Sequence, residues 1–387
     1  MVVAASVVVT VGTVAGLLAA TEQRHGRDKE ARPAEVTGTP RVARPTPPPV
    51  PSRSPEPPST SPAASPSPRP SATRRTSPPP SAPAPSSPPA TGNRSAPATP
   101  RLYRHPDSQV LDWVRAHPGD PRTALIESAI AARPAAVWFT DPAPATLTAR
   151  VREVTSGAAA EGRVPVLVPY AIPDRDCGGH SEGGAPDLAA YDAWIDAFAA
   201  GLGAAEVIVI LEPDSVALSD CLTADDRADR FASLARAGRV LKAADPKARV
   251  YYDAGHSGWH DPAAQAALLR QAGAASAASS DGIFSNVSNF QRTADEIAHD
   301  RRVLDALDGP AGLGAVIDTS RNGNGAPPDG AWCDPAGRKL GTAPTLRTGQ
   351  ARVDAYLWVK LPGESDGCQG TPGTFTPSYA YDLARGA

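Results

Sequence analysis

Short apolar runs recur along the chain from residue 135 onward, and the stretches between them have the length and patterning of helices. The apolar runs predict seven strands, at residues 135–139, 164–170, 207–211, 250–252, 282–285, 315–317 and 355–359. The intervening stretches predict helices, among them residues 188–202, 224–243, 262–272 and 293–307. Alternating strands and helices indicate repeated β-α units around a parallel sheet. Seven strands instead of the regular eight predict an α/β fold, a distorted, TIM-like parallel β/α barrel.

The third predicted strand leads directly into two carboxylates. Residues 207–211 are all apolar, and Glu212, Pro213 and Asp214 follow them. Pro213 has no N–H to give to a sheet ladder, so the strand ends there and Asp214 falls on the first turn of the next loop. We expect Asp214 to lie exposed in a cleft. Glu212 is expected to point into the barrel as a hydrogen-bonded structural group.

Other polar and aromatic residues also fall at or just after predicted strands. They are Trp138, residues 174–177, residues 253–256, Asn286, Asn289, residues 318–322, Lys360, Glu364 and Asp366. A parallel barrel brings these strand ends to one face, which predicts a single cleft. Carboxylates and tryptophans without a nucleotide-binding loop, a Ser-His-Asp arrangement or a metal-binding pattern favour uncharged polar substrates such as sugars. Glycoside hydrolysis needs two carboxyl roles, one of them filled by a group that stays protonated.

Composition divides the chain into three parts. Residues 1–20 are apolar and uncharged, which indicates a signal peptide or a membrane anchor. Residues 21–100, rich in Pro, Ser, Thr and Arg, cannot bury enough apolar surface to fold and predict a disordered linker. Residues 101–387 form the predicted folded domain. We therefore expect an extracellular protein, secreted or attached through its N-terminus to the outer face of the membrane or to the cell envelope.

Charge follows the same division. Residues 1–104 contain 13 Lys or Arg and 5 Asp or Glu, a net charge of +8, and the remainder contains 25 against 36, a net charge of −11. The acidic balance of the folded part argues against nucleic acid as a partner.

All four cysteines lie in the folded part, which in an exported chain predicts two disulfides. We favour Cys177 with Cys221 and Cys333 with Cys368, because each pair would join loops that follow different strands. The sequence alone permits three connectivities. No CxxC or His-rich spacing accompanies the cysteines, so a zinc site is the less favoured alternative.

Several segments resemble glycoside hydrolase family 6 and occur in the order of that family. They are residues 170–177, 211–215, 252–259, 286–289, 318–323, 332–335 and 358–367, and the resemblance covers about residues 103–384. It implies a distorted β/α barrel that hydrolyses β-1,4-glucan with inversion and needs no metal or other cofactor.

The resemblance also implies roles for four carboxylates. Asp214 matches the general acid, and Asp176 would raise its pKa and hold the water. Asp253 would orient the surrounding network, and Asp366 is the candidate base. The family leaves open which carboxylate finally accepts the proton of the water.

Ten further residues match positions that bind sugar in the family. Tyr170 would press on the distorted sugar, the tryptophans would stack on sugar rings, and the others would make polar contacts; they are Tyr170, Arg175, Lys360, Glu364, Trp138, Trp259, Trp332, His256, Asn289 and Ser181. Structural alternatives stay open: an Arg175–Asp176 ion pair, a loop cap by Asp253, and a salt bridge between Lys360 and Glu364 at the rim.

Short loops predict an open cleft and endoglucanase action. Cys221 follows Asp214 by only seven positions, and the Cys333–Cys368 loop is also short, so neither is long enough to roof a tunnel. The expected partner is a β-glucan polysaccharide or oligosaccharide, bound by a monomer. The alternatives are a catalytically idle glucan-binding envelope protein and an enzyme of the same fold that acts on mixed-linkage or another β-glucan.

Overall fold

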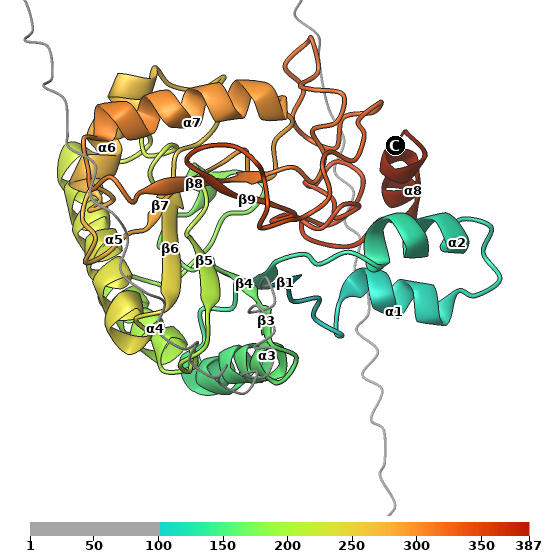
Figure 1. Cartoon of the computed structure of the whole chain (residues 1–387), viewed down its shortest axis with the longest axis horizontal. Coiled ribbons are helices and arrows are strands. Elements are labelled where there is room, and N and C mark those ends of the chain that lie inside the picture. The colour runs from blue at the N-terminus through green and yellow to red at the C-terminus, as the bar shows by residue number, and fades with distance from the viewer. Residues whose placement is uncertain (1–100, 387) are drawn as a thin grey trace, which may run out of the picture. The chain divides into compact units, whose positions relative to one another are not determined.

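The computed structural model describes residues 101–386, and the predicted signal or anchor and the predicted linker lie outside the described residues. Seven parallel strands form the main sheet of this part (Figure 1). In spatial order they are β2 (Val137–Phe139), β4 (Val166–Pro169), β5 (Val207–Leu211), β6 (Ala248–Asp253), β7 (Gly282–Ser285), β8 (Gly314–Asp318) and β9 (Val353–Leu357). The predicted α/β fold with seven parallel strands is confirmed.

The sheet is buried on both faces, as its continuous apolar runs predict. Ile208 and Ile210 of β5 belong to the apolar cluster inside the curled sheet. Val207, Val209 and Leu211 alternate with them and belong to the larger cluster between the sheet and its helices. Strand β5 therefore has no solvated face, and its first residue available to solvent comes after Pro213.

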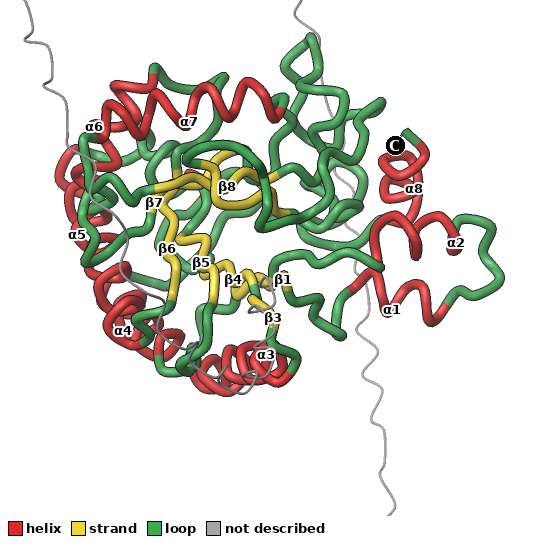
Figure 2. The backbone as a smooth tube through the Cα atoms, viewed as in Figure 1, coloured by secondary structure: helices red, strands yellow, loops and turns green. Residues whose placement is uncertain are grey.

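Five helices cover the outer face of the sheet (Figure 2). They are α3 (Leu147–Ala160), α4 (Leu188–Ala199), α5 (Ala224–Ala244), α6 (Pro262–Gln271) and α7 (Thr293–Leu307). Three of them begin at residues whose side chains accept a hydrogen bond from a backbone N–H of the first turn: Asp187, Thr223 and Asp261. These caps satisfy amides that otherwise have no partner, and they fix where the helices start.

A second group of helices packs beside the edge strands. It comprises α1 (Gln109–Ala116), α2 (Thr123–Ile126), a π-helical turn (Glu127–Ala131) and α8 (Pro377–Arg385). Their apolar side chains form a separate cluster that contains Ile126, Trp358 and Leu383. The first and last helices of the folded part thus pack together beside the edge strands, an arrangement the sequence patterns did not predict.

The barrel is not closed by a strand ladder. Strands β2 and β9 are the two edges of the sheet, and in residues 101–386 no strand pairing joins them. A backbone hydrogen bond from Ala136 N to the Trp358 carbonyl (2.9 Å) and one from the Trp138 indole to the Val359 carbonyl (2.8 Å) connect them instead. The predicted distortion of the barrel is located at this junction.

Two predicted strands need correction. Residues 164–170 are not one strand: β3 (Arg163–Val164) pairs with β1 (Arg101–Leu102) in a separate small sheet, and β4 begins only after Pro165. Proline has no N–H for a continuous ladder, which allows the chain to change partners there. Strand β9 ends at Leu357 and not at residue 359, because the carbonyls of Trp358 and Val359 accept the hydrogen bonds across the open junction.

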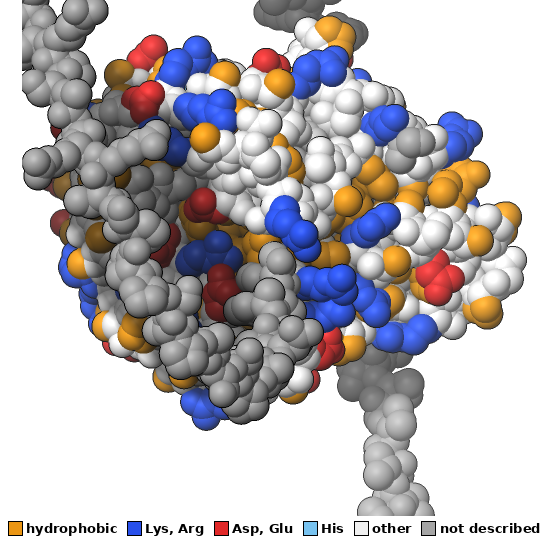
Figure 3. All heavy atoms as spheres, viewed as in Figure 1, with side chains coloured by type: hydrophobic (Ala, Val, Ile, Leu, Met, Phe, Trp, Pro, Cys, Tyr) orange, Lys and Arg blue, Asp and Glu red, His pale blue; other side chains and the backbone are white. Residues whose placement is uncertain are grey.

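No helix among residues 101–386 is long and apolar enough to cross a membrane. On the face seen in Figure 3, acidic and basic side chains are interspersed with uncharged ones.

Candidate active site

A cleft of about 940 Å³ opens where the strands of the main sheet end. Every predicted site residue except Asp253 lines it: Trp138, Tyr170, Arg175, Asp176, Ser181, Asp214, His256, Trp259, Asn289, Trp332, Lys360, Glu364 and Asp366. These residues follow or belong to β2, β4, β5, β6, β7 and β9, with Trp332 on the loop after β8. The structure thus brings together side chains that are more than 200 positions apart.

The backbone at these strand ends adopts unusual angles. Asp176, Glu212, Asp214, Asn286 and Ser288 all have left-handed φ values, between 49° and 68°. Residues other than glycine seldom adopt this region, and such residues cluster at functional sites. The sharp turns direct successive side chains after each strand in different directions, so that Glu212 turns inward while Asp214 faces the cleft.

Asp214 lies in the cleft without a fixed partner. Among the described residues its carboxyl group forms no ion pair, and no hydrogen bond to either side-chain oxygen is found. Burial raises its pKa well above the ordinary range, and the negative charges of Asp253 and Asp176 raise it further. The Lys360 cation opposes this rise without cancelling it. Burial and the two neighbouring carboxylates thus favour the protonated form of Asp214, the form that can donate a proton.

Asp253 lies beneath the loop that carries Asp214 and does not line the cleft. It is 2% exposed, and one carboxylate oxygen accepts hydrogen bonds from Val216 N (3.1 Å) and Ala217 N (2.8 Å). The other oxygen accepts one from Gly255 N (2.9 Å). These contacts tie the loops after β5 and β6 together. Asp253 thus caps the loop after its own strand, as the structural alternative predicted, and its role in orienting the site stays a prediction.

Asp176 lines the cleft from a 3₁₀ turn (Asp176–Gly178) that follows β4. Its carboxylate accepts a hydrogen bond from Ser181 N (2.7 Å). The predicted alternative of an ion pair with Arg175 is wrong, because Arg175 donates to the carbonyls of Ser181, Thr140 and Tyr170 instead. Within residues 101–386 Asp176 forms no ion pair, and it lies close enough to Asp214 to raise the pKa of that carboxyl group.

Asp366 forms the most strongly paired carboxylate of the cleft. Arg321 Nη1 lies 2.7 Å from one oxygen and Lys360 Nζ lies 2.8 Å from the other. Burial alone would raise its pKa, but the charges of Arg321 and Lys360 outweigh burial and lower the pKa of Asp366 to about 2. Asp366 is thus ionised above about pH 2, whereas the pKa of Asp214 is raised. The predicted alternative of a Lys360–Glu364 salt bridge is wrong, since Lys360 pairs with Asp366.

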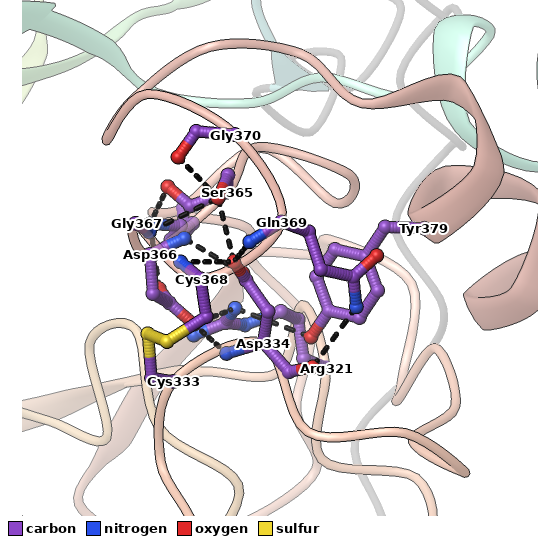
Figure 4. Close-up of a disulfide and its surroundings, with 11 residues drawn as sticks. Arg321, Cys333, Asp334, Ser365, Asp366, Gly367, Cys368, Gln369, Gly370 and Tyr379 are labelled. Atoms are coloured by element: carbon purple, nitrogen blue, oxygen red, sulfur yellow. Dashed lines mark hydrogen bonds and ion pairs between the residues drawn. A yellow bond between two sulfur atoms is a disulfide. The ribbon is translucent and has the colours of Figure 1, made fainter.

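A buried hydrogen-bond network next to a disulfide holds Asp366 in place (Figure 4). The Asp334 carboxylate accepts hydrogen bonds from the backbone N–H groups of Asp366, Cys368 and Gln369. In return, Asp334 N donates to the carboxylate of Asp366 (3.0 Å). Because Cys333 precedes Asp334 and is bonded to Cys368, the disulfide clamps this loop around the site. Both favoured disulfides, Cys177–Cys221 and Cys333–Cys368, are confirmed.

Aromatic rings are spread along the cleft. Trp138 meets Tyr170 edge to face, with ring centroids 5.3 Å apart, and the Arg175 guanidinium lies over the Tyr170 ring, 4.6 Å from its centroid. Trp259 and Trp332 are 39% and 53% exposed, which places free indole faces on the cleft surface. Such faces suit the apolar sides of sugar rings. Their exposure also shows that no loop of residues 101–386 covers the cleft at these two positions.

The remaining predicted contacts are polar. Burial, with smaller effects of His299 and His260, lowers the pKa of His256 to about 4, so its ring is neutral. Burial raises the pKa of Glu364 to about 7 against the opposing charges of Lys360 and Arg321. In residues 101–386, no group of three or more His, Cys, Asp or Glu side chains is arranged to hold a metal ion.

Comparisons with known proteins agree with this geometry. The sequence profile of the family described as "Glycosyl hydrolases family 6" matches residues 98–384. The chain belongs to this family. It is 53% identical over 286 residues to Endoglucanase 1 of Streptomyces sp. (strain KSM-9), covering 74% of this chain and 78% of that protein. It is 48% identical to Endoglucanase A of Thermobispora bispora, covering 74% of this chain and 62% of the relative.

The fold of this family 6 chain is also similar to that of the endoglucanase Cel6 from Mycobacterium tuberculosis, solved in complex with methyl-cellobiosyl-4-deoxy-4-thio-β-D-cellobioside. The TM-score is 0.69 at 40% sequence identity, and the match covers 75% of this chain and 98% of that chain. The predicted family and fold are therefore confirmed.

Sequence reasoning missed three residues that shape this family 6 site. Arg321 and Asp334 lie within segments that carried the resemblance, but nothing in those segments indicated that they hold Asp366. Gln109 reaches the cleft from the start of α1, a helix that was not predicted. Because the sequence patterns did not predict α1, they gave no indication that Gln109 lies at the cleft.

Gly179→Ala is expected to reduce turnover while leaving the fold intact. A Cβ atom at Gly179 would come 2.5 Å from an Asp176 carboxylate oxygen, so the carboxylate would have to move. Gly179 is exposed, and the three atoms nearest to the added methyl all belong to the Asp176 carboxylate. Hydrolysis rates and thermal melting should be measured beside Gly119→Ala, where the added methyl meets nothing. Equal rates in both variants would show that the position of Asp176 does not matter.

Glu212→Gln is expected to flatten the dependence of stability on pH. Glu212 is fully buried and accepts hydrogen bonds from Ala171 N and Ile172 N, and burial raises its pKa from 4.5 to about 7. Between these pH values the folded state binds more protons than the unfolded state, so stability falls as pH rises, by on the order of 3 kcal/mol. Urea unfolding at pH 5 and 8 should show a smaller fall in Glu212→Gln than in the exposed control Glu153→Gln. An identical fall in the free energy of unfolding in both variants would show that Glu212 does not titrate with a raised pKa.

Proposed function

We propose that this chain is an inverting endo-β-1,4-glucanase in which Asp214 is the general acid. The observation that carries the proposal is a carboxyl group with a raised pKa and no ion pair within residues 101–386, in a cleft bordered by exposed tryptophans. Membership of family 6 and the similarity to four proteins named endoglucanases support the same activity. The substrate is a β-glucan chain lying along the cleft.

On the leaving-group side, Asp214 donates its proton to the glycosidic oxygen as the bond to the anomeric carbon breaks. Burial, and then the negative charges of Asp253 and Asp176, raise the pKa of Asp214 and so favour the protonated form that can donate. After donation Asp214 is an anion, which Lys360 helps to stabilise. Tyr170, held between Trp138 and Arg175, presents a fixed ring to the sugar at the cleavage point.

On the opposite side, a water molecule attacks the anomeric carbon. The transition state resembles an oxocarbenium ion, and a water that bonds to such a cation becomes strongly acidic. A carboxylate with a low pKa is then a sufficient base, which suits Asp366 with its pKa of about 2. Asp176, whose carboxylate accepts a hydrogen bond from Ser181 N, would hold the water for attack. Two separate carboxyl roles and direct attack by water give inversion.

The anomer formed first tests this proposal. With residues 101–387 or the full chain and cellohexaose, proton NMR should show an α product from a β bond before mutarotation, and the viscosity of carboxymethylcellulose should fall early relative to the release of reducing ends. A β product formed first would overturn the inverting mechanism. Cellobiose release without a fall in viscosity would overturn internal cleavage.

We further propose that the enzyme acts outside the cell as a monomer. Two disulfides in the folded domain support an oxidising compartment. Residues 1–20 would direct export or anchor the chain, and residues 21–100 would act as a linker to the catalytic domain, residues 101–387.

A further inference from the structure

A second cavity lies beside the cleft, next to Trp138. Its volume is about 220 Å³, and Gln109, Trp138 and Glu364 line both this cavity and the main cleft. Its other walls come mainly from residues 104–110, which lead into α1, and residues 131–137, which lead into β2. We propose that this cavity is an additional glucosyl subsite, which extends the cleft beyond Trp138. The inference rests on the proposed function, because it requires a glucan in the main cleft.

The size of the cavity suits one sugar unit. It has roughly a quarter of the volume of the main cleft, so it offers room for a single ring at the end of a bound chain and not for a second chain. The position of the cavity matters more than its volume. Trp138 lines both spaces, so the cavity is adjacent to the place where a chain stacked on Trp138 would put its next unit.

The chemistry of the walls also suits a sugar. The cavity is lined by Arg104, His105, Asp107, Ser108 and Arg133, which together offer donors and acceptors to hydroxyl groups, and the Trp138 indole adds an apolar surface. Ser108 occupies the N-cap position of α1, yet its side chain makes no capping hydrogen bond. The hydroxyl group of Ser108 is therefore available to a ligand.

The boundary between the two spaces is fixed in place. Gln109 Nε2 donates to the Gly373 carbonyl (2.7 Å) and to Glu364 (3.2 Å), and Gln109 Oε1 accepts from Phe375 N (2.8 Å). The Trp138 indole is held by its hydrogen bond to the Val359 carbonyl. A preformed boundary needs no rearrangement when a longer chain binds, which favours an affinity gain from the extra unit.

The test is the choice between two cleavage positions in one substrate. Cellopentaose can be split into two and three units in two ways, and an ¹⁸O label at the reducing end distinguishes them by mass spectrometry. If the cavity binds a glucosyl unit, the enzyme favours the cleavage position for which the bound cellopentaose occupies the cavity. Ser108→Phe, which fills the cavity, should shift the ratio of the two splits by about three- to tenfold, as expected for the loss of one or two hydrogen bonds. Arg133→Ala should shift the ratio in the same direction by less.

The ratio is an internal measure, so a general loss of folded enzyme would not change it. Ser156→Phe on α3, an exposed serine away from the cleft, is the matched control and should leave the ratio unchanged. An unchanged ratio in both Ser108→Phe and Arg133→Ala would overturn the subsite. A parent protein that cleaves no cellopentaose would instead overturn the proposed function, and the subsite with it.

Discussion

Asp214→Asn is expected to lower kcat on cellohexaose by about 10²- to 10⁴-fold, the usual contribution of a positioned general acid. The amide has nearly the same shape but carries no acidic proton. Because Asp214 makes no ion pair among the described residues, its replacement breaks no structural contact of that kind. The Kd for cellotetraose, measured by calorimetry, should therefore change little.

The control for this loss is Asp229→Asn, an exposed aspartate on α5 outside the cleft. It should retain the parent kcat. If Asp214→Asn kept full activity, the assignment of the acid would be wrong. If it lost binding and turnover equally, Asp214 would be holding the substrate and not protonating it.

Arg321→Met is expected to destabilise the fold by about 3–5 kcal/mol and to abolish hydrolysis. Arg321 is fully buried and pairs with Asp366, and removing one member of a buried pair leaves the other charge without its partner. Its guanidinium also lies over the Phe290 ring, 4.4 Å from the centroid. Unfolding of the full chain in guanidinium chloride measures the loss of stability. Reducing-sugar release measures the loss of hydrolysis.

Two further variants separate charge from packing. Arg321→Met combined with Asp366→Asn removes both charges and should recover part of the lost stability, but no activity. Arg236→Met breaks two partly exposed pairs, with Asp192 and Asp196, and should cost about 1 kcal/mol. A cost for Arg321→Met as small as that for Arg236→Met, or full activity in the double variant, would contradict the role given to this pair.

The sequence predicted most of the barrel because its strands are buried on both faces. The limits of β5 and β7 were found to the residue, and those of α7 as well. Pro213 also fixed the position of Asp214 outside the core. These features depend on short stretches of chain, where apolar runs and proline determine local structure directly.

The contacts that hold Asp366 could not be predicted in the same way. Arg321 is 45 positions from Asp366, and a single sequence does not show which buried cation meets which carboxylate. The pairing of β1 with β3, and the packing of α1 and α8 against the open edge, likewise depend on contacts between distant segments. Asp253 was identified, but its place beneath the Asp214 loop emerged only from its three backbone hydrogen bonds.

The most direct test of proton donation by Asp214 is whether the loss of rate in Asp214→Asn depends on the leaving group. Rates of Asp214→Asn and parent should be compared on cellohexaose and on a cellobiosyl fluoride, whose departing fluoride needs little help from a general acid. We predict a loss of at least about 10²-fold on cellohexaose and a much smaller one on the fluoride. Equal losses on both substrates would contradict the central claim.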